Sequence, residues 1–214
     1  MRNSYKSLLA LGVVSVGLSL AADAGRAQED GFVPLFDRKT MTGLKPVGVK
    51  DGTFKVENGE IVCTGKPNGY FATEKSFKNY HLKFEWKFLR PEGLTEDSKF
   101  NGNSGCLVHI AGDHKVWPRS IEIQGYNKDM GAILFVSGAK KKSVMKYPDA
   151  QKKGIKPVGE WNLVEVISKD GKLTAIVNGE KTAECESDLT EGTIGWQSEG
   201  APINFRNLRI KVTE

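Results

Sequence analysis

The stretch His81-Leu82-Lys83-Phe84-Glu85-Trp86-Lys87-Phe88-Leu89 decides the fold class. Apolar side chains occupy every second position from Leu82 to Phe88, and charged or polar side chains occupy the positions between them. Successive side chains of a β-strand point to opposite faces of the sheet. This alternation therefore predicts a strand with one face in a core and the other in solvent.

Shorter runs of the same kind lie on both sides of this stretch. Asn58-Gly59 is the dipeptide most typical of a two-residue hairpin, and it divides residues 53–64 into two strands. Asp170-Gly171 and Asn178-Gly179 divide residues 162–185 into a three-stranded meander. The other predicted strands are 104–111, 120–125, 193–197 and 203–212, the last with a bulge at Asn207. No apolar 3.6-residue period is sustained, so we predict a two-sheet antiparallel β-sandwich with almost no helix.

Two polar stretches, residues 91–103 and 137–159, lack the alternation and are predicted to be irregular loops. The second carries seven lysines: Lys140, Lys141, Lys142, Lys146, Lys152, Lys153 and Lys156. Such a run is typical of a solvated loop, and it is also compatible with a surface that attracts anionic glycans.

The amino terminus has the pattern of a secretory signal peptide. Arg2 and Lys6 precede an apolar run from Leu8 to Leu20, which is short for a membrane span, and small residues follow it. Cleavage after Ala27 is preferred over cleavage after Ala24. We therefore expect a signal peptide over residues 1–27, one β-sandwich domain over residues 28–214, and a periplasmic or extracellular protein.

The charge of the mature chain argues against a nucleic-acid partner. Loss of residues 1–27 removes three positive charges and one negative charge, which lowers the net charge from +5 to +3. That is weak for a nucleic-acid binder. Nothing after residue 27 is apolar for long enough to span a membrane.

Three cysteines, Cys63, Cys106 and Cys185, lie in or beside alternating strands, which predicts small buried side chains. Export would permit one disulfide, but the sequence does not choose a pair. The sequence has no HExxH, GxSxG, P-loop or CxxC motif.

The run Ser120-Ile121-Glu122-Ile123-Gln124 is the most informative candidate for chemistry. The two-residue period places Glu122 and Gln124 on one face and the two isoleucines on the other. A carboxylate next to an amide, backed by an apolar face, suits a polar cleft on a sandwich. An exposed strand face is the alternative.

Other residues repeat this pairing of polar and apolar groups. His109 is predicted to point to the same face of its strand as Leu107, and Glu85 lies between Phe84 and Trp86. Trp196-Gln197 and Trp161-Asn162 each place an amide beside an indole. That combination suits sugars, whose C–H faces stack on rings while their hydroxyls bond to amides, although a tryptophan is usually buried in any case.

The order of segments from Phe32 to Lys211 resembles the 3-keto-disaccharide hydrolase domain family. The segments that carry the resemblance are Val33-Pro34-Leu35-Phe36-Asp37, Phe54-Lys55-Val56-Glu57-Asn58-Gly59-Glu60-Ile61, Tyr80-His81-Leu82-Lys83-Phe84-Glu85-Trp86-Lys87, Gly102-Asn103-Ser104-Gly105, Ile121-Glu122-Ile123-Gln124, Gly159-Glu160-Trp161-Asn162, Val177-Asn178-Gly179, Gly192-Thr193-Ile194-Gly195-Trp196-Gln197 and Phe205-Arg206-Asn207-Leu208-Arg209-Ile210. The resemblance implies a concanavalin-like jelly-roll sandwich.

Several positions depart from the family pattern. His109 stands where an arginine is usual, Ile121 where a tyrosine is usual, and Ser198-Glu199 where a histidine often follows the second glutamine. The opening Thr42-Gly43-Leu44-Lys45 lacks the usual tryptophan, and Gly125-Tyr126-Asn127 lacks an aspartate. These positions bear on activity and substrate rather than on the fold.

The resemblance also implies chemistry on 3-keto glucosides. The ketone acidifies the C2 proton, a base removes it, donors or a divalent metal ion stabilise the enolate, and the C1 substituent leaves before water adds. Glu122 and His109 are the expected catalytic residues and the residues that would hold a metal ion. The expected substrate-binding residues are Gln124, Asn103, Glu85, Gln197, Trp161 and Lys87. From strand parity and the matching family positions, we expect a single concave face on which five side chains converge, with Asn103 at its rim: Glu122, Gln124, His109, Glu85 and Gln197.

Two other functions are compatible with the same sequence. One is a non-catalytic carbohydrate-binding module, because the fold also serves lectins and fold does not fix function. The other is a matrix or surface interaction protein that uses the lysine-rich stretch. The expected partner is a carbohydrate both for the enzyme and for the binding module.

Overall fold

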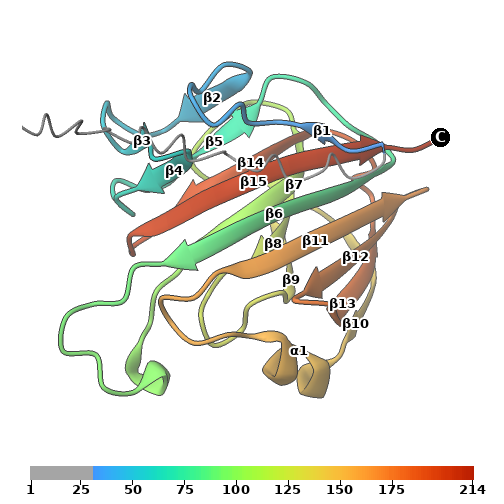
Figure 1. The fold of residues 1–214 in the computed structure, drawn as a ribbon. Helices are drawn as coiled ribbons and strands as arrows, with labels where there is room; N and C mark the ends of the chain where they lie inside the picture. Colours follow the sequence, from blue (N-terminus) through green and yellow to red (C-terminus); the bar gives the residue numbers. More distant parts are fainter. Residues whose placement is uncertain (1–30) are drawn as a thin grey trace, which may run out of the picture.

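The computed structural model describes residues 31–214, so the predicted signal peptide, residues 1–27, lies outside the described residues. Two antiparallel sheets form the fold (Figure 1). Sheet A has the order β10 (Lys141–Lys146), β13 (Glu180–Ser187), β12 (Lys172–Val177), β11 (Asn162–Lys169), β6 (Tyr80–Phe88), β15 (Ile203–Val212), β4 (Glu60–Cys63) and β3 (Phe54–Glu57), with β1 (Val33–Pro34) beside β15. Sheet B has the order β2 (Leu44–Val47), β5 (Gly69–Thr73), β14 (Thr193–Ser198), β7 (Gly105–Ala111), β8 (Arg119–Gln124) and β9 (Ile133–Val136). The predicted two-sheet sandwich is confirmed.

The turn dipeptides form the hairpins that the sequence predicts. Asn58 and Gly59, between β3 and β4, have φ of 51° and 77°. Asn178 and Gly179, between β12 and β13, have φ of 50° and 87°. Positive φ at both central residues matches the twist of the flanking strands, and asparagine and glycine adopt it at the lowest steric cost. The predicted bulge is also present, because the pairing of β15 with β6 shifts at Asn207.

The core lies between the sheets and is built from the inward side of each alternating strand. Phe71 and Trp196 of sheet B stack with their ring centroids 5.2 Å apart, and Phe84 of sheet A meets Trp196 edge-on at 5.6 Å. The three cysteines are buried and free, so the expectation of small buried side chains is confirmed. Burial of this kind stabilises a domain by roughly 25 cal/mol per Å² of apolar surface.

The expectation that residues 137–159 form an irregular loop is wrong. This stretch contains the edge strand β10 and the helix α1 (Pro148–Gly154). β10 pairs on one side with β13 and leaves its side chains mostly exposed, so its sequence needs no apolar alternation. The other polar stretch, 91–103, holds only the short 3₁₀ helix η1 (Asp97–Lys99). Within residues 31–214, no helix is long and apolar enough to cross a membrane.

Candidate active site

The side of sheet B that faces away from sheet A carries a set of polar side chains, and we call it the outer face of sheet B. Glu122 on β8 pairs with Leu107 on β7 and with Leu134 on β9, so it lies between two leucines in its cross-strand row. Gln124 pairs with Gly105 in the adjacent row. Because Trp196 of β14 pairs with Cys106, the next residue, Gln197, lies opposite Gly105. The two rows thus bring Glu122, Gln124 and Gln197 around one glycine.

Gly105 makes room for this arrangement because it has no side chain. A Cβ atom at this position would overlap the Oε1 atoms of both Gln197 and Glu122. The two side chains from neighbouring strands therefore converge over the Gly105 backbone. Any larger residue at position 105 would push them apart.

Glu122 is only 6% exposed, and burial changes its acidity. Desolvation raises the pKa of Glu122 to about 8, and the charge of nearby Glu199 acts in the same direction. The carboxyl group therefore carries a proton at neutral pH. A group that titrates near neutral pH within a polar cluster is well suited to donate and accept protons during a reaction.

Gln197 is 1% exposed, and neither its Nε2 nor its Oε1 has a hydrogen-bond partner among the described residues. Leaving a buried amide unpaired costs about 1–3 kcal/mol per group, so such a group calls for an explanation. Asn103, beyond the end of the Gly105 strand, also has a buried and unpartnered Oδ1. Gln124 already has one hydrogen-bond partner, since its Oε1 accepts a hydrogen bond from the Tyr126 N–H at 2.8 Å. A polar ligand on this face would supply the missing partners of Gln197.

The expectation that His109 lies beside Glu122 is wrong. The register between β7 and β8 shifts between Val108 and Ala111, and His109 itself has φ of 52°. This bulge turns the imidazole inward, where it is fully buried. Its Nδ1 lies 3.1 Å from the Leu189 carbonyl oxygen, and its Nε2 lies 3.2 Å from Ser168 Oγ. The histidine therefore links the two sheets and does not face the site.

Burial gives His109 a consequence for stability that can be measured. Desolvation lowers its pKa from 6.5 to about 4, against a smaller raising effect of the Leu189 carbonyl. As pH falls from 6.5 to 4, the unfolded chain gains a proton that the folded chain does not. The parent should therefore lose about 3 kcal/mol of stability over this range through His109 alone.

Replacing His109 by asparagine, which tolerates the positive φ, tests this prediction. The variant should be less stable than the parent at pH 7 and should show a smaller loss between pH 7 and pH 4, measured by urea unfolding. Tyr80, whose ring meets the imidazole edge-on, stays neutral because burial holds its pKa well above 10. An equal acid loss in both proteins would contradict the assignment to His109.

Glu85, Lys87 and Trp161 are also absent from this face. Glu85 and Lys87 point outward from β6, so they lie on the opposite side of the sandwich. Arg206 pairs with Glu85 at 2.7 Å and stacks over Trp161 at 4.0 Å, and Lys87 lies 4.6 Å from the same ring. The expectation that Glu85 converges with Glu122 is wrong. With Arg206, these three residues form a separate cluster of charged and aromatic side chains beside sheet A.

The same placement bears on a metal ion. Glu122 and His109 point to opposite faces of sheet B, so they cannot share an ion as the sequence suggested. Over residues 31–214, no group of three or more histidine, cysteine, aspartate or glutamate side chains is arranged to hold a metal. His109 therefore belongs to no metal site on this face, and the reaction steps proposed for the site are assigned to side chains.

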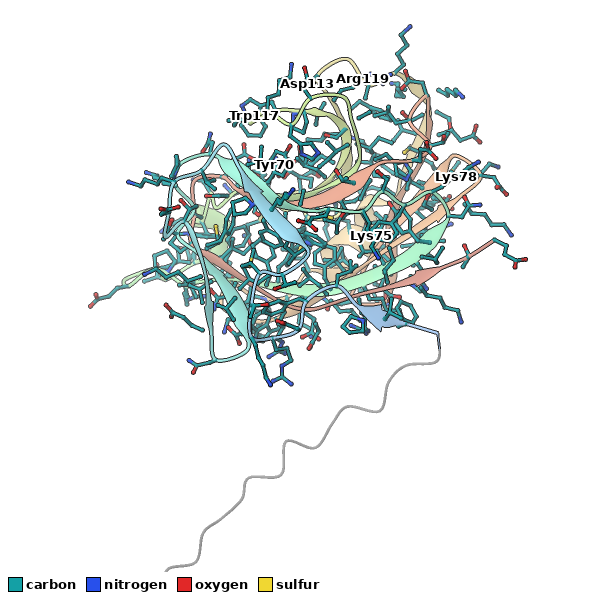
Figure 2. The ribbon with its side chains drawn as sticks, turned by 90° about the horizontal axis from the view of Figure 1, so that it is seen from above. Tyr70, Lys75, Lys78, Asp113, Trp117 and Arg119 are labelled. Carbon is teal, nitrogen blue, oxygen red and sulfur yellow. The ribbon has the colours of Figure 1, made fainter. Side chains whose placement is uncertain are left out.

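Three residues of the site region were missed by sequence reasoning. Tyr70 on β5 pairs with Gln197, and its hydroxyl lies 3.0 Å from His114 Nδ1 in the β7–β8 connection. In Figure 2 this connection, which also carries Asp113 and Trp117, rises beside Tyr70. Leu134 borders Glu122, and Glu199 follows Gln197 by two positions. Strand parity was the signal that could have found Glu199.

Comparison with known proteins identifies a family for the chain. The model of the 3-keto-alpha-glucoside-1,2-lyase-like domain family matches residues 31–211. A Bacteroides thetaiotaomicron protein named 3-keto-disaccharide hydrolase is 25% identical across 92% of this chain and 82% of its own length.

Solved structures share the fold. A candidate glycosyl hydrolase from Parabacteroides distasonis has a TM-score of 0.62 at 24% identity, covering 86% of this chain and 94% of that one. A carbohydrate-binding module, CBM66, from Bacillus subtilis has a TM-score of 0.53 at 11% identity, covering 79% and 95%. At these identities the two likenesses concern the fold alone.

Proposed function

Because the chain belongs to the 3-keto-alpha-glucoside-1,2-lyase-like domain family, we propose that it cleaves 3-keto glycosides by elimination across C1 and C2, followed by addition of water. The family places it among carbohydrate-active enzymes. The substrate and the sequence of steps are the proposal. One observation carries it: a glutamate that titrates near neutral pH shares the space over Gly105 with an amide that lacks partners.

Each of these groups has a role in the proposed reaction. A ketone at C3 acidifies the C2 proton, and its loss generates an enolate whose oxygen needs hydrogen-bond donors. The unpartnered Gln197 Nε2–H is suited to donate to that oxygen, and a preorganised donor stabilises developing charge better than water does. Glu122 exchanges a proton with the substrate, and its burial keeps the carboxyl group desolvated. Gln124 and Asn103 contact hydroxyl groups at the border.

Incubation of the purified protein with 3-keto-trehalose and other 3-keto glucosides tests the proposal. We expect release of glucose from 3-keto-trehalose, with transient 3-keto-2-hydroxy-glucal detected by mass spectrometry. A parallel series with chelator and with added divalent ions tests for a metal requirement. If the protein binds glycans but cleaves none of these substrates under any condition, a non-catalytic binding module replaces the enzyme.

We also propose that the protein is exported, on the basis of the apolar run Leu8 to Leu20 and the small residues after it. Intact-mass analysis of the protein from the periplasmic or extracellular fraction should show loss of residues 1–27, or of residues 1–24 if the earlier site is used. Retention of Met1 in that fraction would refute export by a cleaved signal.

A further inference from the structure

A second carboxyl group lies on the outer face of sheet B, at the end of β14. Strand parity points Gln197 outward, Ser198 inward and Glu199 outward again, and the Ser198 hydroxyl indeed donates inward to the Pro67 carbonyl oxygen at 2.9 Å. Asn103 forms isolated bridges with Glu199 and Gly200, so Glu199 and Asn103 make the row that follows Gln197 and Gly105. Glu199 is therefore one row away from the amide that lacks partners.

The two carboxyl groups differ in their surroundings. Glu122 is enclosed between leucines, whereas Glu199 is half-buried at the border of the face and accepts a hydrogen bond from the Asn103 side chain. Burial raises the pKa of Glu199, and the Asn103 hydrogen bond opposes that change. Because the negative charge of Glu199 raises the pKa of Glu122, Glu199 gives up its proton at a lower pH than Glu122 does. Such a pair contains one proton donor and one proton acceptor.

We propose that Glu199 is the second acid–base group of this site and works opposite Glu122, an inference that rests on the proposed function. In the elimination, the C2–H bond breaks and its proton passes to the Glu199 carboxylate. The electron pair forms the C1–C2 double bond by way of the enolate, the C1–O bond breaks, and the leaving oxygen takes the proton of Glu122.

Addition of water restores both groups. Water attacks C1 of the 2-hydroxy-glucal and gives a proton to the Glu122 carboxylate, while Glu199 returns its proton to C2. The sum of the two halves is hydrolysis of the glycoside, with both carboxyl groups back in their first protonation states. No oxidant, reductant or metal ion is needed for this balance.

The other titratable groups of this region are poorly placed for the second role. The Tyr70 hydroxyl lies against His114 Nδ1, and burial raises the pKa of Tyr70 to about 12. Cys106 lies behind the sheet in the core, where desolvation raises its pKa well above 9. Glu85, the other buried glutamate considered above, is paired with Arg206 on sheet A. Glu199, in contrast, lies on the same face as Gln197 and in the adjacent cross-strand row.

The test measures cleavage of 3-keto-trehalose labelled with deuterium at C2, with Glu199→Gln compared with the parent. We expect turnover and loss of the C2 deuterium to fall at least about 100-fold with little change in KM, in line with typical acid–base contributions. Glu57→Gln, an exposed glutamate on β3 of sheet A, is the matched control and should retain parental rates. Thermal unfolding and circular dichroism establish that each variant is folded.

A pH profile separates an acid–base role from a structural one. The parent should lose activity on the acid side as Glu199 gains a proton, and Glu199→His should restore part of the turnover with that limb moved toward the imidazole pKa. If Glu199→Gln keeps turnover within about threefold of Glu57→Gln while the parent is active, Glu199 is not the second group and the proposed function stands. If the folded parent cleaves no 3-keto glycoside, the proposed function and this inference both fail.

Discussion

Glu122→Gln is expected to lower turnover of 3-keto glycosides at least about 100-fold, the typical contribution of a positioned acid–base group. Glutamine keeps the shape and the hydrogen-bonding capacity of the side chain but cannot give up or take a proton at neutral pH. Gly105 and Gln197, which border the carboxyl group, are unchanged, so binding should survive. The measurement is steady-state release of glucose from 3-keto-trehalose, with KM and kcat determined separately.

The pH dependence of the parent gives this prediction a second readout. Because the pKa of Glu122 is raised to about 8, activity that needs its proton should decline as pH rises through that value. Parental turnover in a folded Glu122→Gln variant would show that Glu122 exchanges no proton in the reaction. The Glu57→Gln variant controls for the replacement of a carboxyl group by an amide away from the site.

The same substitution should make the protein more stable in alkaline solution. The pKa of Glu122 rises from 4.5 to about 8 on folding, so the folded chain holds a proton that the unfolded chain releases between these values. The parent therefore loses stability as pH rises from about 4.5 to about 8, by an amount on the order of 3 to 5 kcal/mol. Glutamine cannot ionise, so Glu122→Gln should escape this loss.

Urea unfolding at pH 5 and pH 9 measures the difference. We expect similar stabilities at pH 5 and a variant that is more stable than the parent at pH 9. The titratable groups that interact with Glu122 include Glu199 on the same face and Cys106 behind the sheet. They are identical in both proteins. A stability difference that is the same at both pH values would contradict the raised pKa of Glu122.

The architecture was predictable because local signals and burial agree along most of the chain. The alternation of β6 and the Asn58-Gly59, Asp170-Gly171 and Asn178-Gly179 turns specify strands and hairpins without reference to distant residues. Strand β10 and helix α1 were not predictable in this way. Both are short and solvent-exposed, so neither needs an apolar pattern, and tertiary contacts decide their conformation.

The site could be predicted only where the regular alternation of side chains along a strand is unbroken. Regular alternation correctly placed Glu122 and Gln124 together, and Gln197 and Asn103, which the family resemblance implied, lie on the same face. His109 was misplaced because one bulge residue reverses parity, and no local signal marks where that extra residue falls. Glu85 was misplaced because a sandwich has two outer faces. Alternation says which side chains leave the core but not on which side of the molecule they emerge.

The lysine-rich edge strand β10 has a consequence for how copies of this protein behave at high concentration. An unpaired strand edge is a template on which a second chain can add its own strand, and polymers can grow in this way. Lys141, Lys142 and Lys146 crowd positive charge along that edge. Two such edges repel one another on approach, so the β10 end of sheet A is protected from pairing with the β10 end of another copy. We expect concentrated solutions to stay free of fibres at low salt, and the protection to weaken as added salt screens the lysines.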